Sequence, residues 1–173
     1  MQRQLLPRQV DARKLTSTDV QISGFAPVSE FPRFIVGLYD DAGEVDIEMH
    51  FFRDEAWLHR ISASLATQVS VLCQRCLKSM TLSINSSFEL GIVWTEEQAK
   101  ALPRGLDSMI LGEEVLDLLP LVEDELIIGT PYANYHPVGE CRPAGPVEYG
   151  ETNRGEVKRE NPFAALKDLK PSD

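Results

Sequence analysis

The chain has few basic residues for its size and no long apolar run. Lysine and arginine number 17 against 27 aspartate and glutamate residues, which gives a formal net charge of −10. A surface this acidic repels the phosphate backbone of nucleic acids, so no long-range attraction to RNA or DNA is expected. No segment approaches the roughly 18 apolar residues that a membrane helix needs. The composition therefore predicts neither a membrane protein nor a DNA-binding protein.

Cysteine is also scarce, since 173 residues contain only three, too few for a disulfide framework. The first stretch, MQRQLLPRQVDARKL, has no apolar central region of the kind that a secretory signal carries. We therefore expect a cytoplasmic protein whose cysteines stay reduced. A hydrophobic content of 43% and a charged content of 25% are typical of a globular domain with its own core.

Alternation of apolar and polar residues is the clearest pattern in the chain. Apolar side chains occupy nearly every second position in the stretches 45–51, 57–71 and 80–94. A period of two predicts strands with one solvated face, and their succession along the chain predicts an antiparallel meander. A further short strand is expected at 107–111.

Helix signals surround this predicted sheet. A single helical turn is expected at 11–16, and Ser29 can cap a helix through FPRFIVGLY. EEQAKAL is expected to form a short helix that ends at Pro103, and Asp117 is expected to cap a longer helix, LLPLVEDELIIG. The fold class predicted is α+β, an antiparallel β-meander packed with two or three helices and followed by a flexible C-terminal tail.

The last of these helices carries three consecutive acids. Leu118, Val122 and Leu126 share one face of it, while Glu123 to Glu125 occupy much of the rest. The acidic trio is expected to face solvent.

The C-terminal part has a different composition. Only four of the nineteen residues 142–160 are apolar, which predicts a flexible linker between an α+β domain, 1–141, and a short helical motif, 161–170. This motif, NPFAALKDLK, could dock a partner protein or fold back on its own sheet. Its cap, first helical residue and apolar edge, the candidate partner-binding residues, are Asn161, Pro162, Phe163, Leu166 and Leu169.

The stretch VLCQRCLKSM holds two of the three cysteines. Predicted strands lie on both sides, so Cys73 and Cys76 are expected at the tip of a hairpin, where two thiolates can project toward one zinc ion. His136 and Cys141, in HPVGEC, would complete a set of three cysteines and one histidine. Two alternatives remain, a reduced turn without metal and a redox dithiol in which Arg75 favours the thiolate.

No other motif points to catalysis. The chain has no phosphate-binding loop, no glycine-rich dinucleotide motif and no serine elbow. A non-enzymatic role is therefore expected.

Four motifs in a fixed order make the chain resemble the bacterial YceD family. They are the CQRC turn, EEQAKALP, LLPLVEDELIIGTP with the histidine and cysteine that follow it, and the closing NPFAALKDLK. The resemblance extends from Leu5 to Lys170. Within the family, the chain is similar to members of the proteobacterial branch. Other branches carry further cysteines near HPVGEC, arranged like a second CxxC element, whereas only His136 and Cys141 stand here.

The resemblance implies a role in the synthesis, processing or stability of 23S ribosomal RNA, and so in large-subunit assembly. The family is not known as an enzyme family. One route is direct RNA contact through a small basic patch of Arg60, Arg75 and Lys78. The other route is binding of a basic ribosomal protein or an assembly factor, which the nine acids and two bases between Thr95 and Thr130 favour. A zinc-binding or thiol-redox protein acting through the cysteine pair is the alternative function.

Overall fold

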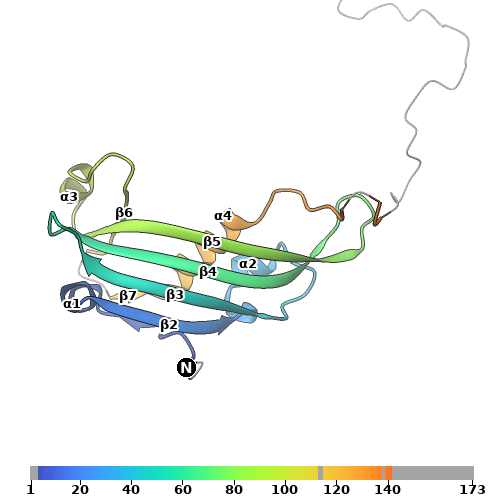
Figure 1. Cartoon of the computed structure of the whole chain (residues 1–173), viewed down its shortest axis with the longest axis horizontal. Coiled ribbons are helices and arrows are strands. Elements are labelled where there is room, and N and C mark those ends of the chain that lie inside the picture. Colours follow the sequence, from blue (N-terminus) through green and yellow to red (C-terminus); the bar gives the residue numbers. More distant parts are fainter. Residues whose placement is uncertain (1–3, 113–114, 138, 142–173) are drawn as a thin grey trace, which may run out of the picture. The chain divides into compact units, whose positions relative to one another are not determined.

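The three alternating stretches form neighbouring strands of one sheet. They are β3 (Glu44–Arg53), β4 (His59–Leu72) and β5 (Ser79–Val93), which pair antiparallel in this order (Figure 1). The computed structural model describes residues 4–112, 115–137 and 139–141. The predicted linker and the helical motif at 161–170 lie outside the described residues.

Two further strands extend the sheet at its edges. β2 (Val20–Pro27) pairs antiparallel with β3, and β6 (Asp107–Ile110) pairs parallel with the end of β5. The sequence predicted β6 but missed β2, because Gly24 and Ala26 replace large apolar residues in its inward positions. A second, two-stranded sheet joins β1 (Gln9–Val10) to β7 (Leu116–Asp117). The α+β prediction is confirmed.

Three helices form where the sequence predicted them. α1 (Ala12–Thr18) begins at Asp11, whose carboxylate accepts a hydrogen bond from Lys14 N at 3.0 Å. α3 (Glu96–Lys100) is capped by Thr95, and α4 (Leu118–Gly129) is capped by Asp117, which accepts from Leu119 N at 3.1 Å. No helix in the described part of the chain is long and apolar enough to cross a membrane.

The helix predicted after Ser29 is wrong in its start and its length. Val28–Glu30 form a 3-10 turn, η1, and α2 comprises only Pro32–Ile35. The N-cap residue of α2 is Phe31, and its side chain makes no hydrogen bond to the backbone of the helix. A carboxylate from another helix, that of Glu123 in α4, takes that place.

Glu123 of α4 is buried, which corrects the prediction that the whole acidic trio faces solvent. Its carboxylate accepts hydrogen bonds from Arg33 N at 2.6 Å, Arg33 Nε at 2.7 Å and Phe34 N at 3.3 Å. Burial raises the pKa of Glu123, but these bonds and the guanidinium charge outweigh it and hold the pKa below its ordinary value. Glu123 therefore caps α2. Asp124 remains exposed, and Glu125 accepts from the Ser86 hydroxyl.

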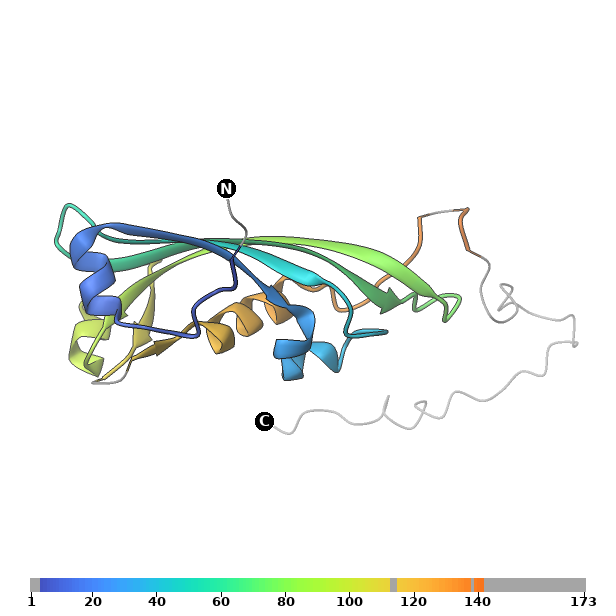
Figure 2. The same cartoon turned by 90° about the horizontal axis from the view of Figure 1, so that it is seen from below.

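The core lies on one face of the sheet. α4 and α2 cover that face, while no helix formed by the described residues covers the middle of the opposite face (Figure 2). Leu118, Val122 and Leu126 of α4 are fully buried, as are inward residues of β3 and β4 such as Phe51 and Ile61. The alternation in the strands and the apolar stripe of α4 thus form one shared core.

Gly24 allows the N-terminal segment to approach the edge of β2. A Cβ there would lie 2.9 Å from Gln4 O and 3.2 Å from Leu6 N. Leu6 N donates to Phe25 O at 2.9 Å, and Phe25 N donates to Gln4 O at 3.0 Å, so this segment covers the edge.

Gly24→Ala is expected to push the N-terminal segment away and to lower the free energy of unfolding by about 1–3 kcal/mol, because both neighbours are backbone atoms. Hydrogen exchange should speed up at the Leu6 and Phe25 amides. Gly37→Ala is the matched control, since its Cβ would meet only Phe34 O at 3.7 Å. Equal amide protection in both variants would contradict the prediction.

Candidate metal centre

A tight turn between β4 and β5 presents Cys73 and Cys76. Cys73 N donates to Lys78 O at 2.9 Å, and Leu77 N donates to Cys73 O at 2.9 Å. Leu77 adopts a left-handed backbone with φ 58°, which reverses the chain within the turn. The two thiols are therefore fixed at the tip of the hairpin.

The loop that follows α4 returns to this tip (Figure 1). Gln74 N donates to Asn134 O at 2.8 Å, which fastens the loop to the turn just before His136. The guanidinium of Arg75 lies 5.8 Å from the centre of the Tyr135 ring, a cation–π contact on the same loop. These contacts carry His136 and Cys141 to the cysteine pair.

The four predicted ligands come together. One ligand atom from each of Cys73, Cys76, His136 and Cys141 lies within 4.8 Å of the others. The Sγ atoms of Cys73 and Cys141 are 3.8 Å apart, and Cys76 Sγ is 3.5 Å from His136 Nδ1. In a tetrahedral zinc site, Zn–S bonds of about 2.3 Å place two ligand sulfur atoms about 3.8 Å apart. A Zn–N bond of about 2.1 Å places the nitrogen about 3.6 Å from each sulfur. The spacing therefore fits one zinc ion.

The electrostatics of the turn favour a thiolate at Cys73. Burial opposes its ionisation, but N–H groups of His136, Cys76 and Arg75 and the His136 ring lower its pKa to about 5. Burial and the neighbouring Cys73 and Cys76 raise the pKa of the Cys141 thiol. A bound cation would remove this repulsion between sulfur atoms, which is how metals ionise clustered thiols.

A metal ion held by these four residues would have a structural role. Cys73 is buried and the other three ligands are half-buried, so the protein itself fills a tetrahedral set. Structural zinc sites have four protein ligands, whereas catalytic sites keep one position for water or substrate. A metal here would cross-link the hairpin tip to the loop after α4.

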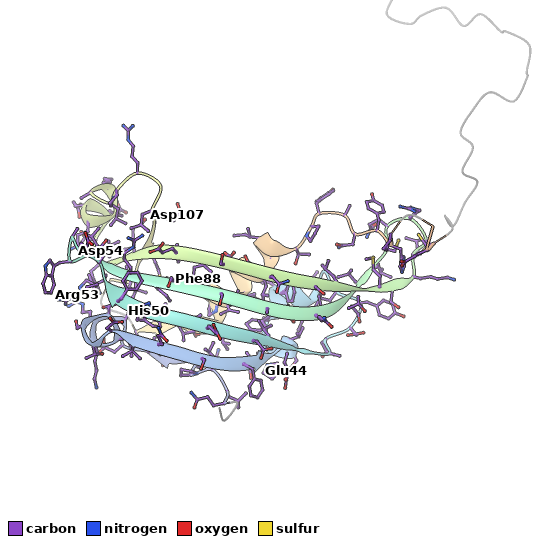
Figure 3. The ribbon with its side chains drawn as sticks, viewed as in Figure 1. Glu44, His50, Arg53, Asp54, Phe88 and Asp107 are labelled. Atoms are coloured by element: carbon purple, nitrogen blue, oxygen red, sulfur yellow. The ribbon has the colours of Figure 1, made fainter. Side chains whose placement is uncertain are left out.

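The three residues predicted to bind RNA do not form one patch. Arg75 and Lys78 share the cysteine turn, whereas Arg60 pairs with Gly91, far along β4. The Arg60 guanidinium lies 2.7 Å from a Glu89 carboxylate oxygen and 3.4 Å from one of Asp54. Asp54 lies at the opposite end of the sheet from the cysteine turn (Figure 3). Arg60 is thus paired with two acids, one on β5 and one in the turn between β3 and β4.

A cluster of side chains that no sequence pattern predicted fastens α1 to the sheet. The Thr16 hydroxyl is hydrogen-bonded to His59 Nδ1, and the His59 ring packs edge-on against Trp94 at 4.7 Å. The Arg13 guanidinium lies 4.4 Å from the Trp94 ring centre. Burial, followed by the charges of Arg53 and Arg13, lowers the pKa of His59. No short-range pattern signals this cluster, because its members are distant in the sequence.

Comparisons with known proteins give one consistent result. The family model described as large ribosomal RNA subunit accumulation protein YceD matches residues 61–170, which include all four residues of the centre. A protein of Haemophilus influenzae named large ribosomal RNA subunit accumulation protein YceD is 26% identical over 172 residues, covering 98% of this chain and 99% of the relative. No solved structure matches the chain.

Proposed function

Because the chain belongs to the YceD family, we propose that it is a cytoplasmic, non-enzymatic factor for 23S ribosomal RNA. It would support the synthesis, processing or stability of that RNA and thereby the assembly of the large ribosomal subunit. The observation that carries this proposal is the similarity over nearly the whole of both chains to a protein named for accumulation of large-subunit RNA. The match spans the residues of the sheet, α4 and the candidate metal centre, and this extent supports a shared role.

The charges favour a basic partner protein over RNA itself. Between Thr95 and Thr130 the chain has nine acids and two bases, and this segment builds α3, β6 and α4 beside β5. Such a surface repels phosphates and attracts a lysine- and arginine-rich protein. A basic ribosomal protein or an assembly factor of the large subunit is therefore the proposed partner.

Direct RNA contact is the rival route, and the cysteine turn offers two basic side chains for it. Lys78 is exposed, and Arg75 is half-buried against Tyr135. Two phosphate contacts supply little affinity at physiological salt, because binding to nucleic acid grows with the number of counterions released.

Ultraviolet crosslinking of the tagged chain in cells tests whether the chain contacts RNA or a partner protein. RNA and co-purified proteins are analysed from one sample. We expect a basic large-subunit protein or an assembly factor to co-purify, with 23S RNA crosslinks at the level of an untagged control. RNA crosslinks that disappear when Arg75→Ala and Lys78→Ala are combined would establish direct contact instead. Loss of the partner on removing residues 161–173 would assign docking to the C-terminal motif.

The function itself has a separate test. Cells that lack the protein are expected to have a lower ratio of 23S to 16S ribosomal RNA, restored by the wild-type chain. An unchanged ratio in growing cells would contradict the proposed role whatever the partner.

Zinc binding is a second proposal, and the fit of the four ligand atoms to a tetrahedron favours it. The ion would hold the loop after α4 on the hairpin tip, so that the shape of this end of the protein would depend on the metal.

A further inference from the structure

The two edges of the five-stranded sheet differ in how they are covered. At the β2 edge, Gln4 and Leu6 bond to Phe25. At the other edge, β6 pairs only with Leu90–Val93, the C-terminal end of β5. Within the described part of the chain, no strand lies beside the preceding residues of β5 on the side away from β4 (Figure 1).

The direction of the backbone groups on this edge follows from one hydrogen bond. Leu111 N donates to Val93 O at 2.9 Å, so the peptide groups of Val93 point away from β4. Successive residues of a strand direct their N–H and C=O groups to opposite sides. The outward groups of the uncovered part therefore belong to Thr81, Ser83, Asn85 and Ser87. None of them bonds to another described residue.

An open edge of this length is a template for another strand, and natural proteins shield such edges with prolines, bulges, charges or a covering segment. The stretch Thr81–Ser87 contains no proline and no charged residue. Its pairing with β4 continues without interruption, so no bulge twists it away. Seven residues also match the ordinary length of a strand.

α4 lines one side of this edge. Glu125 accepts a hydrogen bond from Ser86, and a Cβ on Gly129 would lie 3.2 Å from Ile84 Cγ2, so this flank of the helix faces β5. Glu123 on the opposite flank faces Arg33 of α2. Residues four and three positions apart share a helical stripe, which places Ile128 beside Glu125. Ile128 is 76% exposed, so an acid and an apolar side chain adjoin the open edge.

We propose that an extended, basic segment of a partner protein adds as a sixth strand along Thr81–Ser87 of β5. Main-chain hydrogen bonds would hold it, as in other cases of strand addition. A lysine or arginine would lie toward Glu125 and an apolar residue toward Ile128. This inference rests on the proposed function, because it assigns the binding surface for the basic protein partner.

Charge decides between a partner and a second copy of the chain. Each chain has a net charge of −10, and two copies joined at this edge would bring two acidic α4 helices together. Like charges across an interface oppose association, whereas a basic segment meets complementary charge.

The first test uses the isotope-labelled full chain and a synthetic peptide of alternating lysine and valine, KVKVKVK. Backbone amides of Thr81, Ser83, Asn85 and Ser87 should shift and exchange more slowly when the peptide is added, while those of Leu82 and Ile84 already bond to β4. The acidic counterpart EVEVEVE should have no effect. Perturbation confined to another surface, or equal effects of both peptides, would overturn the inference.

Ser83→Pro removes an outward N–H that faces solvent, where an edge strand tolerates proline. It should weaken peptide binding roughly tenfold or more, about 1.4 kcal/mol, while Ser83→Ala, the matched control, binds like the wild type. Equal binding by both variants would overturn the proposal. If Ser83→Pro unfolds, Asn85→Pro takes its place, and the amide pattern of the wild type decides independently.

Expression of the same variants in cells lacking the protein separates the two proposals. A wild-type chain that leaves the 23S to 16S ratio unrestored contradicts the proposed function, and the peptide titration still decides the edge. A folded Ser83→Pro chain that restores the ratio and retains its basic partner contradicts the edge proposal alone.

Discussion

The chain purified in reducing buffer without chelator is expected to contain one zinc ion, and the His136→Ala variant well below one. Three thiols and an imidazole lie at tetrahedral spacing, and the turn holds Cys73 as a thiolate with a pKa of about 5. Removal of one ligand leaves an incomplete set, which binds the ion far more weakly. Elemental analysis of the folded protein measures the content directly.

His50→Ala is the matched control for this experiment. His50 contacts an acid and not a thiol, with its Nε2 atom 2.5 Å from Asp19 Oδ1, and it lies on β3 outside the centre. Its variant should keep the zinc of the wild type. A wild-type content near zero would exclude the metal, and an equal loss in both histidine variants would show that a general change in folding removes it.

Loss of the ion should also lower the melting temperature, because a ligand that binds only the folded chain stabilises it by mass action. The loosening should concentrate in the cysteine turn and the loop after α4, which the centre joins. Amide exchange with and without chelator should therefore rise at Gln74, whose N–H bonds to Asn134, and stay unchanged at Ile61 in the core. A uniform increase would contradict a local role for the metal.

Glu123→Gln is expected to lower the free energy of unfolding by about 2–3 kcal/mol at pH 7. The neutral amide loses charge-assisted hydrogen bonds from Arg33 and from the start of α2, and such bonds contribute about 1.5–3 kcal/mol. Asp124→Asn is the matched control, because Asp124 pairs with the same guanidinium at 2.7 Å but its side chain is 59% exposed. Exposed pairs contribute only about 0–1 kcal/mol. Urea denaturation measures both variants.

The effect of Glu123→Gln should depend on pH in a defined direction. The folded pKa of Glu123 lies below its unfolded value of about 4.3, so the folded state favours the carboxylate. The stabilisation is therefore present above the unfolded pKa and is lost as the pH falls through the folded pKa. The difference between wild type and variant should be full at pH 7 and should shrink below about pH 4. A difference that stays constant down to pH 3 would contradict the assignment.

Short-range patterns predicted those parts of the fold that depend on neighbours in the sequence. The period of two in 45–51 and 80–94 predicted strands because a half-buried strand must alternate. Asp117 was predicted to cap α4 because its carboxylate needs only Leu119 two residues away. β2 was missed because small residues at Gly24 and Ala26 weaken the same alternation.

The candidate centre was predicted in composition but not in arrangement. Two cysteines between strands indicated a hairpin tip, and a histidine and a cysteine elsewhere could complete a ligand set. Whether they meet depends on the path of the loop after α4, which the bond from Gln74 to Asn134 fixes across the fold. For Arg60 the tertiary structure separates residues that were predicted to lie together. Its predicted role in RNA binding assumed that it lies near Arg75, but the two residues are at opposite ends of β4.

By itself the sequence determined the strands β3 to β6, most helix starts and the residues available to hold a metal, since these follow from periodicity and side-chain chemistry. The tertiary structure alone decided that Glu123 is buried as a cap for α2, and that β6 pairs only with Leu90–Val93 at the end of β5. Both outcomes depend on where elements distant in the sequence come to lie. Burial and edge pairing are properties of those long-range contacts, and no local pattern of residues contains them.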